Sequence, residues 1–215
     1  MIRVRREDFV SRVFISQFYR RQQSAGSLFL AVRAQQSTKD AMKSSVFIAT
    51  SLDGFIARAD GRLDWLPEGG GEPHGYTEFI ATVDALVIGR KTFETVLSFS
   101  EWPYGTKPVV VLSSSPGTLE APPGTMCTFI NATPAEVVDR LAAEGMSHLY
   151  IDGGVTIQRF LTAGLIQRVI ITRVPVVLGT GIPLFGPVAH DIRFSHVATR
   201  AYPSGLVQSE YAVAT

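Results

Sequence analysis

The chain has 215 residues, 46% of them hydrophobic and 18% charged, which is enough for one substantial core and too little for two compact domains. Its net charge of +1 combines a basic segment 1–43 with a mildly acidic remainder. An acidic body argues against nucleic acid as the main partner, because phosphate backbones need cations clustered across one face.

Residues 1–43 form a basic N-terminal extension with nine Arg or Lys against three Asp or Glu. This composition is typical of a dispensable extension, of an organelle-targeting peptide or of a surface helix, and Glu7 and Asp8 weigh against targeting. We expect a dispensable extension, with Met42 as the functional start. Its longest apolar stretch, 28–32, is too short for a signal-peptide core or a membrane span, so no membrane partner is expected.

The body opens with a strand that leads into a long loop. Residues 45–51 are apolar and partly β-branched, which predicts a buried strand. Residues 53–75 contain six glycines and two prolines, and loops of this length in compact domains are usually functional or disordered. Residues 76–84 have apolar side chains at helical spacing and predict a helix.

A second apolar strand, 85–88, runs directly into a helix start. Gly89 lets the backbone turn tightly, and the next residues bring unpaired helix N–H groups together with the positive end of the helix dipole. Arg90, Lys91 and Thr92 add charge-assisted donors, so the junction is typical of a phosphate site. A glycine and a cation after a strand also serve simply to turn the chain and to solvate a helix.

Two further strands are predicted at 108–112 and 126–130. The first ends in a hydroxyl cluster, Ser113, Ser114 and Ser115. After the second, Thr133, Pro134 and Glu136 form the pattern of a helix N-terminus with a capping box, and Gly145 is expected to end that helix.

The last part of the body continues the alternation of strand and helix. Residues 148–152 predict a strand, Gly153 and Gly154 follow, and 155–163 predict a helix. Residues 168–177 predict another strand, and two late segments, 195–201 and 206–214, read as a terminal antiparallel hairpin. We therefore expect a single α/β domain over 44–215, with a mainly parallel central sheet flanked by helices.

The single cysteine, Cys127, excludes an internal disulfide, and the four scattered histidines show no metal-ligand spacing. We therefore expect no metal, and a reducing cytoplasm fits best. Three of the predicted strands end in small, hydroxyl or cationic residues, at 89–92, 112–115 and 152–154. Ligands of open parallel sheets bind outside the carboxyl ends of the strands, so these three ends together are suited to one long cofactor.

The body resembles the dihydrofolate reductase superfamily, and within it the reductase domain of bacterial riboflavin biosynthesis and its stand-alone relatives. The resemblance spans residue 44 to the C-terminus. Five segments carry it in order: FIATSLDGFIA (47–57), GRKTFE (89–94), LSSSPG (112–117), the glycine pair 153–154 and LGTGIPLF (178–185). It implies a dihydrofolate reductase-like fold and NADPH as the cofactor.

Carried over residue by residue, the resemblance implies that the phosphates of NADPH are held after the second strand, the adenosine after the third, and the nicotinamide near Ala49 and Ile56. It also implies a cis peptide bond at the glycine pair. The implied cofactor-binding residues are Ala49, Ile56, Gly89, Arg90, Lys91, Thr92, Leu112, Ser113, Ser114, Ser115, Ile151, Gly153, Gly154, Val155 and Thr156.

Three residues are candidates for catalysis. Asp53 either contacts the substrate or caps its own turn, since Asp-Gly is a common turn pair. Glu78 is a candidate proton supplier or an ordinary exposed helical glutamate, and we favour the second interpretation. Thr172 falls where dihydrofolate reductases keep a threonine that supports the substrate ring. Trp65 forms either a wall of the site or a hydrophobic anchor.

The resemblance implies an NADPH-dependent reductase of a pyrimidine- or pterin-type heterocycle, most like 5-amino-6-(5-phosphoribosylamino)uracil reductase, and a homodimer. Alternatives are a dihydrofolate reductase and an NADPH-binding protein of the same fold without catalysis. The arginines that pathway enzymes use for the substrate phosphate are not clearly matched here. Arg58, Arg62 and Arg173 are the available substitutes.

Overall fold

The computed structural model describes residues 42–67 and 73–214. The predicted extension 1–43 lies outside the described residues except for Met42 and Lys43, so its role stays a prediction. Within the described part of the chain, no helix combines the length and apolar character needed to cross a membrane.

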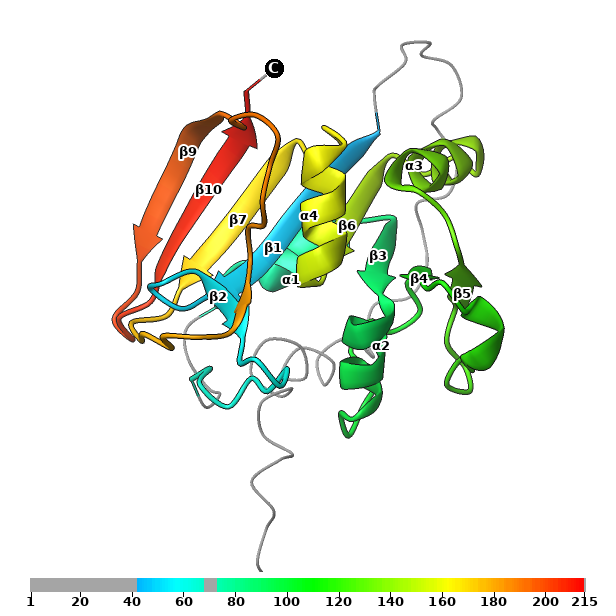
Figure 1. Ribbon diagram of the computed structural model, residues 1–215, viewed down its shortest axis with the longest axis horizontal. Helices are drawn as coiled ribbons and strands as arrows, with labels where there is room; N and C mark the ends of the chain where they lie inside the picture. The colour runs from blue at the N-terminus through cyan, green and yellow to red at the C-terminus, as the bar shows by residue number, and fades with distance from the viewer. Residues whose placement is uncertain (1–41, 68–72, 215) are drawn as a thin grey trace, which may run out of the picture.

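The described residues form an eight-stranded sheet in the order β5-β4-β3-β6-β1-β7-β10-β9 (Figure 1). The strands from β5 to β7 in this order run parallel, and β10 pairs antiparallel with both β7 and β9. The predicted mainly parallel sheet with a C-terminal hairpin is confirmed. The strands are β1 (Lys43–Thr50), β3 (Ala85–Gly89), β4 (Val109–Leu112), β5 (Cys127–Ile130), β6 (His148–Asp152), β7 (Arg168–Arg173), β9 (Phe194–Ala201) and β10 (Val207–Val213).

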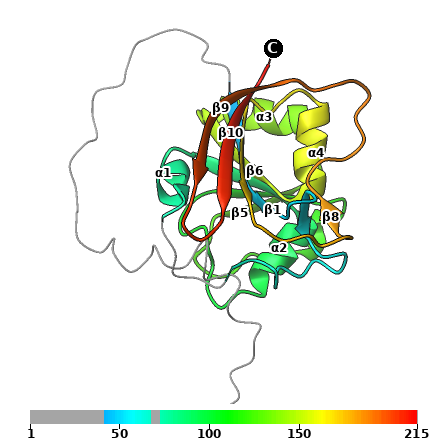
Figure 2. The same ribbon diagram turned by 90° about the vertical axis from the view of Figure 1, so that its left-hand side faces the viewer.

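Helices cover both faces of this sheet, as the edge-on view shows (Figure 2). On one face α3 (Pro134–Ala143) and α4 (Gly154–Thr162) bury Val137, Leu141 and Phe160 against the sheet. On the other face α1 (Tyr76–Ala81) and α2 (Arg90–Leu97) bury Phe79 and Phe93. Consecutive strand residues alternate between the two cores, as expected for strands covered on both sides.

Local rules account for the best-defined boundaries. The capping box of α3 is present: the Glu136 N–H donates to Thr133 Oγ1, and the Thr133 N–H donates to Glu136 Oε2 at 2.7 Å. Gly145 follows the helix with a φ of 84°, which is the left-handed conformation expected after a helix C-terminus. The strand 148–152 has the bounds expected from its apolar run.

Two elements are shorter than predicted by three residues or more. Helix α1 ends at Ala81 rather than at residue 84, because Thr82 Oγ1 donates to the Phe79 carbonyl and Asp84 accepts from the Ser147 and His148 N–H groups. Strand β7 ends at Arg173 rather than at residue 177. The chain leaves the sheet there towards Pro175, which has no N–H to continue a ladder.

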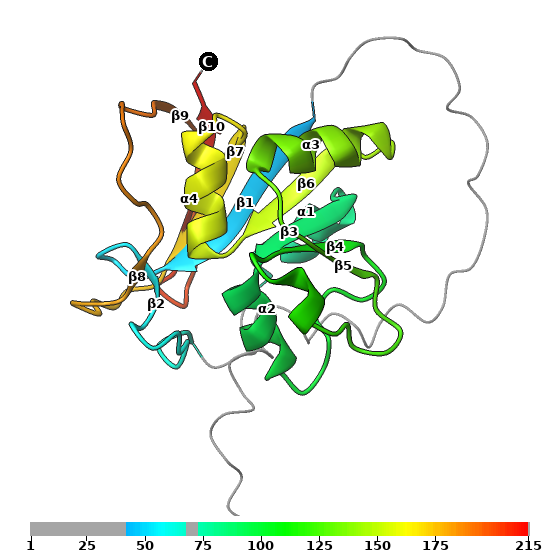
Figure 3. The same cartoon turned by 45° about the vertical axis from the view of Figure 1, so that its right-hand side comes forward.

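The long predicted loop 53–75 contains a short strand. Residues of β2 (Phe55–Ala57) pair antiparallel with β8 (Ile182–Pro183), which lies in the connection after β7. Figure 3 shows β2 and β8 side by side, next to the end of α4 at which that helix begins. The loop that follows β1 and the loop that follows β7 therefore form one layer at the carboxyl edge of the sheet.

Candidate functional site

The three predicted ligand-binding strand ends lie next to one another at one edge of the sheet. In the parallel registers Gly89 of β3 lies opposite Leu112 of β4, and Ile88 lies opposite Asp152 of β6. The helix after β3 covers one face of the sheet, whereas the helix after β6 covers the other. The chain thus changes face between two adjacent strands, which is the arrangement at which open α/β sheets bind their ligands.

The first turns of α2 and α4 are in direct contact at this point, and glycines permit the contact. A Cβ atom added to Gly89, the N-cap of α2, would lie 2.8 Å from Thr156 Oγ1 of α4. A Cβ added to Gly153, the N-cap of α4, would overlap Thr92 Oγ1 of α2. Each helix thus places a threonine where the other has a glycine, so two helix N-termini converge on one place.

This convergence suits an anion. Each helix presents unpaired N–H groups and the positive end of its dipole, and two such ends reinforce one another. Arg90 adds a guanidinium that donates to Glu94 Oε1 at 2.7 Å and to Thr118 Oγ1 at 3.2 Å, while Lys91 is exposed. The predicted phosphate-binding residues Arg90, Lys91 and Thr92 are therefore brought together with the glycine pair.

The predicted serines lie at the next strand end. Ser113 is buried, and its hydroxyl accepts from the Ser115 N–H at 3.1 Å, whereas Ser114 and Ser115 are exposed. Leu112 and Ile151 are buried in the core beneath this edge. On α4, Val155 is exposed and Thr156 is buried.

The predicted cis peptide bond at the glycine pair is wrong, because all peptide bonds of the described residues are trans. Gly153 instead has φ 93° and ψ 133°, a conformation that side chains rarely adopt, and its N–H donates to Asp152 Oδ1 at 2.7 Å. The positive φ of one glycine is enough to bring the backbone against α2.

The layer made by β2 and β8 covers the start of α4. A Cβ atom on Gly154 would lie 3.0 Å from Ile56 Cδ1 and 3.2 Å from Ile182 Cγ2. Gln158 of α4 ties the same layer down, because its Nε2 donates to the Pro183 carbonyl at 3.0 Å. Ile56, predicted to lie near the cofactor, is thus placed beside the glycine pair.

Asp53 holds this layer together. Its carboxylate accepts from Ser51 Oγ at 2.6 Å, from the Gly179 N–H at 2.7 Å and from the Leu178 N–H at 3.2 Å. The Ser51 hydroxyl, followed by the two backbone N–H groups, lowers the pKa of Asp53, so it is ionised at neutral pH. These contacts give Asp53 a positioning role between the loops after β1 and β7, a role that neither sequence interpretation included.

The predicted residues on the α1 side are arranged around Thr172. Ala49 of β1 lies opposite Thr172 of β7, whose Oγ1 accepts from Gln208 Nε2 at 2.9 Å. Gln208 Nε2 also donates to the His74 carbonyl at 3.0 Å, which ties the segment before α1 to the sheet. Gln208 was not predicted. Glu78 is exposed on α1, whose buried residues Tyr76 and Phe79 face the sheet.

Asp152 is the carboxylate that sequence reasoning missed. It lies opposite Ile88 on the α1 side of the sheet, and it is electrostatically coupled to the hydroxyls of Tyr76, Tyr104 and Tyr150. Burial raises the pKa of Asp152 to about 6, although the Gly153 N–H and the Tyr150 hydroxyl oppose part of that shift. The signal in the sequence is an acid that ends an apolar strand directly before a glycine pair.

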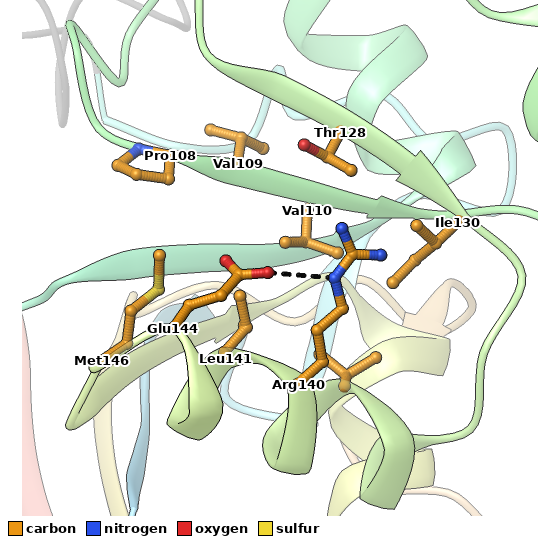
Figure 4. Close-up of a pocket in the computed structure, with 10 residues that line it drawn as sticks. Pro108, Val109, Val110, Thr128, Ile130, Arg140, Leu141, Glu144 and Met146 are labelled. Carbon is orange, nitrogen blue, oxygen red and sulfur yellow. Dashed lines mark hydrogen bonds and ion pairs between the residues drawn. The ribbon is translucent and has the colours of Figure 1, made fainter.

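A separate small hollow lies under α3 (Figure 4). Arg140 and Glu144 line it and form an ion pair between Arg140 Nε and Glu144 Oε1 at 3.1 Å, and Pro108 and Val109 line it at the beginning of β4. None of the predicted cofactor-binding residues lines it, so it is not part of the site at the helix N-termini. Among residues 42–67 and 73–214, no three His, Cys, Asp or Glu side chains are grouped to hold a metal ion.

Comparisons with known proteins agree with this architecture. A family model described as the RibD C-terminal domain matches residues 44–208. The crystal structure of a putative riboflavin biosynthesis protein from Shewanella sp. PV-4 is 40% identical, with a TM-score of 0.71, and the match covers 81% of this chain and 100% of that one.

Two more distant structures share the fold alone. A diaminohydroxyphosphoribosylaminopyrimidine deaminase/5-amino-6-(5-phosphoribosylamino)uracil reductase from Thermotoga maritima is 16% identical, with a TM-score of 0.63, over 82% of this chain and 58% of that one. Dihydrofolate reductase from Enterococcus faecalis, complexed with NADP(H) and RAB-propyl, is 17% identical, with a TM-score of 0.56, over 82% and 98%. The predicted dihydrofolate reductase-like fold is confirmed.

The contact between the two helix N-termini predicts a severe effect of Gly153→Ala. The new methyl group would overlap Thr92, and the alanine would have to keep the positive φ of Gly153. We therefore expect the free energy of unfolding, measured with urea, to fall by about 2–5 kcal/mol. Gly164→Ala is the matched control, because Gly164 also has a positive φ but no atom lies near its Cβ position. Equal losses in the two variants would contradict the proposed role of the contact.

The Asp53 contacts predict local opening in Asp53→Ala. Loss of a charged acceptor should speed hydrogen exchange of the Leu178 and Gly179 amides by about tenfold or more, as measured by exchange mass spectrometry. Asp60→Ala is the control, because Asp60 bonds only within its own turn to Arg62. Unchanged exchange at 178–179 would show that Asp53 does not hold this loop.

The raised pKa of Asp152 predicts a pH-dependent effect of Asp152→Asn. The folded state binds the proton more tightly than the unfolded state, so this carboxyl destabilises the fold as the pH rises from 3.8 through about 6. The isosteric amide should therefore be more stable than the wild type by about 1–3 kcal/mol at pH 8, with a smaller difference at pH 4.5. Urea unfolding of both proteins measures this, and a less stable variant at pH 8 would contradict the assignment.

Proposed function

The chain belongs to the RibD C-terminal domain family, and from this premise we propose that it is an NADPH-dependent reductase of a pyrimidine- or pterin-type heterocycle. One observation supports the proposal: two helix N-termini and two cations converge where the sheet changes face, beside a glycine pair that lets the two helices approach closely. We also propose that the reductase domain spans 44–215, that 1–43 is dispensable, and that the protein is a cytoplasmic homodimer.

The residues present fit a dinucleotide that carries a 2′-phosphate. The N–H groups of α2 and α4 and the Thr92 hydroxyl would hold the pyrophosphate. Arg90 and Lys91 would hold the 2′-phosphate, and the exposed Ser114 and Ser115 would border the adenosine. A side chain at Gly153 would collide with Thr92 of α2, and one at Gly154 would meet Ile56 and Ile182, so the glycines keep the two helix starts and the β2–β8 layer close together.

The nicotinamide end would lie near Ala49 and Ile56. Bound NADPH supplies a hydride to an electrophilic carbon of the substrate. The protein has to hold that carbon in line and exclude water, and the layer of β2 and β8, tied down by Asp53 and Gln158, provides a wall for this purpose.

Reduction also consumes a proton, and Asp152 is the best-placed candidate to hold it. Its pKa of about 6 leaves a usable protonated fraction at neutral pH, and it lies on the α1 side of the sheet next to the glycine pair. Glu78 is less suitable because it is exposed on the outer side of α1. Dihydrofolate reduction therefore has weaker support than reduction of an aminopyrimidine, although Thr172 is present.

The proposal is tested first by cofactor binding. NADPH should bind at least about tenfold more tightly than NADH, because charge-assisted bonds to the 2′-phosphate contribute about 1.5–3 kcal/mol. Arg90→Ala should remove most of this preference, whereas Arg159→Ala, an exposed arginine further along α4, should keep it. Nicotinamide fluorescence measures both constants. Equal affinity of the wild type for the two cofactors would contradict the phosphate assignment.

The second arm of the test is turnover. NADPH absorbance should fall when an aminopyrimidine riboside or a pterin is added to the protein. Tight NADPH binding without oxidation against either class would favour a binding protein of the same fold over an enzyme. Turnover of dihydrofolate that disappears in Glu78→Gln would favour dihydrofolate reductase.

A further inference from the structure

The carboxyl edge of the sheet has two halves: a cofactor half at the N-termini of α2 and α4, and a substrate half on the α1 side. The charged groups around the two halves differ. On the α1 side, the strand ends present Ala49, Thr172 and Asp152, together with the aromatic rings of Tyr76 and Tyr104. Tyr76 Oη is buried without a hydrogen-bond partner among the described residues. This half therefore offers a carboxylate acceptor and an unpaired hydroxyl.

Arg58 and Arg62 lie in the loop after β2, and the segment 58–64 has no net charge. Arg58 Nε lies 2.6 Å from Asp64 Oδ1, and Arg62 Nε lies 2.6 Å from Asp60 Oδ2. Trp65, which follows Asp64, is buried against Val174 and Tyr202, and Ala49 packs on the same cluster. The loop is therefore anchored beside the strand ends. Each arginine thus carries its own counter-ion.

Four other cations near the carboxyl edge of the sheet have different positions. Arg173 is exposed, but the alternation along β7 places it on the face opposite to Thr172. Arg200 is exposed on the edge strand β9 opposite Gln208, so that β10 separates it from Thr172. Arg90 and Lys91 belong to the helix N-terminus that would hold the cofactor.

We propose that the substrate is a heterocycle without a phosphate group, held through ring N–H and carbonyl groups that face Asp152 and Tyr76. This inference rests on the proposed reductase function and narrows it. It separates this chain from enzymes whose substrate is a phosphoribosylaminopyrimidine, although the fold and the cofactor half are shared.

The charges give the physical reason. A phosphate carries nearly two negative charges at neutral pH, and beside Asp152 it would meet a like charge and a loop of zero net charge. A lactam or amino heterocycle instead donates N–H groups to a carboxylate and accepts from a tyrosine hydroxyl. Buried, unpaired polar groups also reject analogues that leave them without a partner.

The test compares 5-amino-6-(5-phosphoribosylamino)uracil with the same compound after enzymatic removal of its phosphate. With NADPH in excess, kcat/KM should be at least tenfold higher for the dephosphorylated compound. An equal or higher value for the phosphorylated compound would overturn the inference.

Binding separates this inference from the function on which it rests. If neither compound and no pterin is reduced, the proposed function is contradicted, and calorimetry with the NADP⁺-loaded protein then decides the substrate class. The dephosphorylated compound should bind at least tenfold more tightly than the phosphorylated one. Equal or tighter binding of the phosphorylated compound, or no binding of the dephosphorylated one, overturns the inference.

A charge variant tests the cause. Asp64→Asn leaves Arg58 without its counter-ion, so affinity for the phosphorylated compound should rise at least threefold, with no change for the dephosphorylated compound. Asp139→Asn on α3 is the control, because it makes the same change in net charge at an exposed position on a helix that does not border the site. Equal effects of the two variants, or no effect of Asp64→Asn, would contradict the role assigned to the loop.

Discussion

The contact between the first turns of α2 and α4 is the constraint on which the rest of the candidate site depends. The two helices cover opposite faces of the sheet, so they meet only because β3 and β6 are neighbours and because Gly89 and Gly153 have no side chains. Their convergence sums two helix dipoles at one place. It also fixes Asp152, which ends β6 and bonds to the Gly153 N–H, on the side of the sheet away from α4. The convergence of the two helix N-termini and the position of the carboxylate thus belong to one packing arrangement.

The edge of the sheet is consequently divided by charge. On the side of the helix N-termini, the helix dipoles and the net positive charge of Arg90, Lys91 and Glu94 make the environment positive. On the α1 side, Asp152 and the loop 58–64, whose charges cancel, make it neutral to negative. A hydride donor that carries phosphates would bind on the positive side, and an uncharged substrate that accepts the hydride would bind on the α1 side. The reacting carbons would meet near Ala49, between the two halves.

The sequence predicted what is determined locally. The capping box of α3 and the strand 148–152 depend on neighbouring residues, and the structure confirms both. The contact between Asp53 and the loop at 178–179 joins residues about 125 positions apart, and local rules contain no signal for such a pair. Asp152 was missed for a related reason: its pKa is raised by burial, which arises only once the sheet and its covering helices have assembled. The prediction of a cis peptide bond was wrong, because the positive φ of Gly153 already brings the backbone of α4 close to α2.

The layer formed by β2 and β8 has a consequence for folding. Its two strands, β2 and β8, lie far apart in the sequence. They directly follow β1 and β7 in the chain, and these two strands also pair with each other. Loop-closure entropy opposes such distant contacts until the intervening sheet has assembled. We therefore expect the wall beside the glycine pair to be among the last contacts made during folding. A nucleotide that needs this wall would bind only to the finished domain, so its binding would shift the equilibrium towards the fully folded chain and away from partly assembled forms.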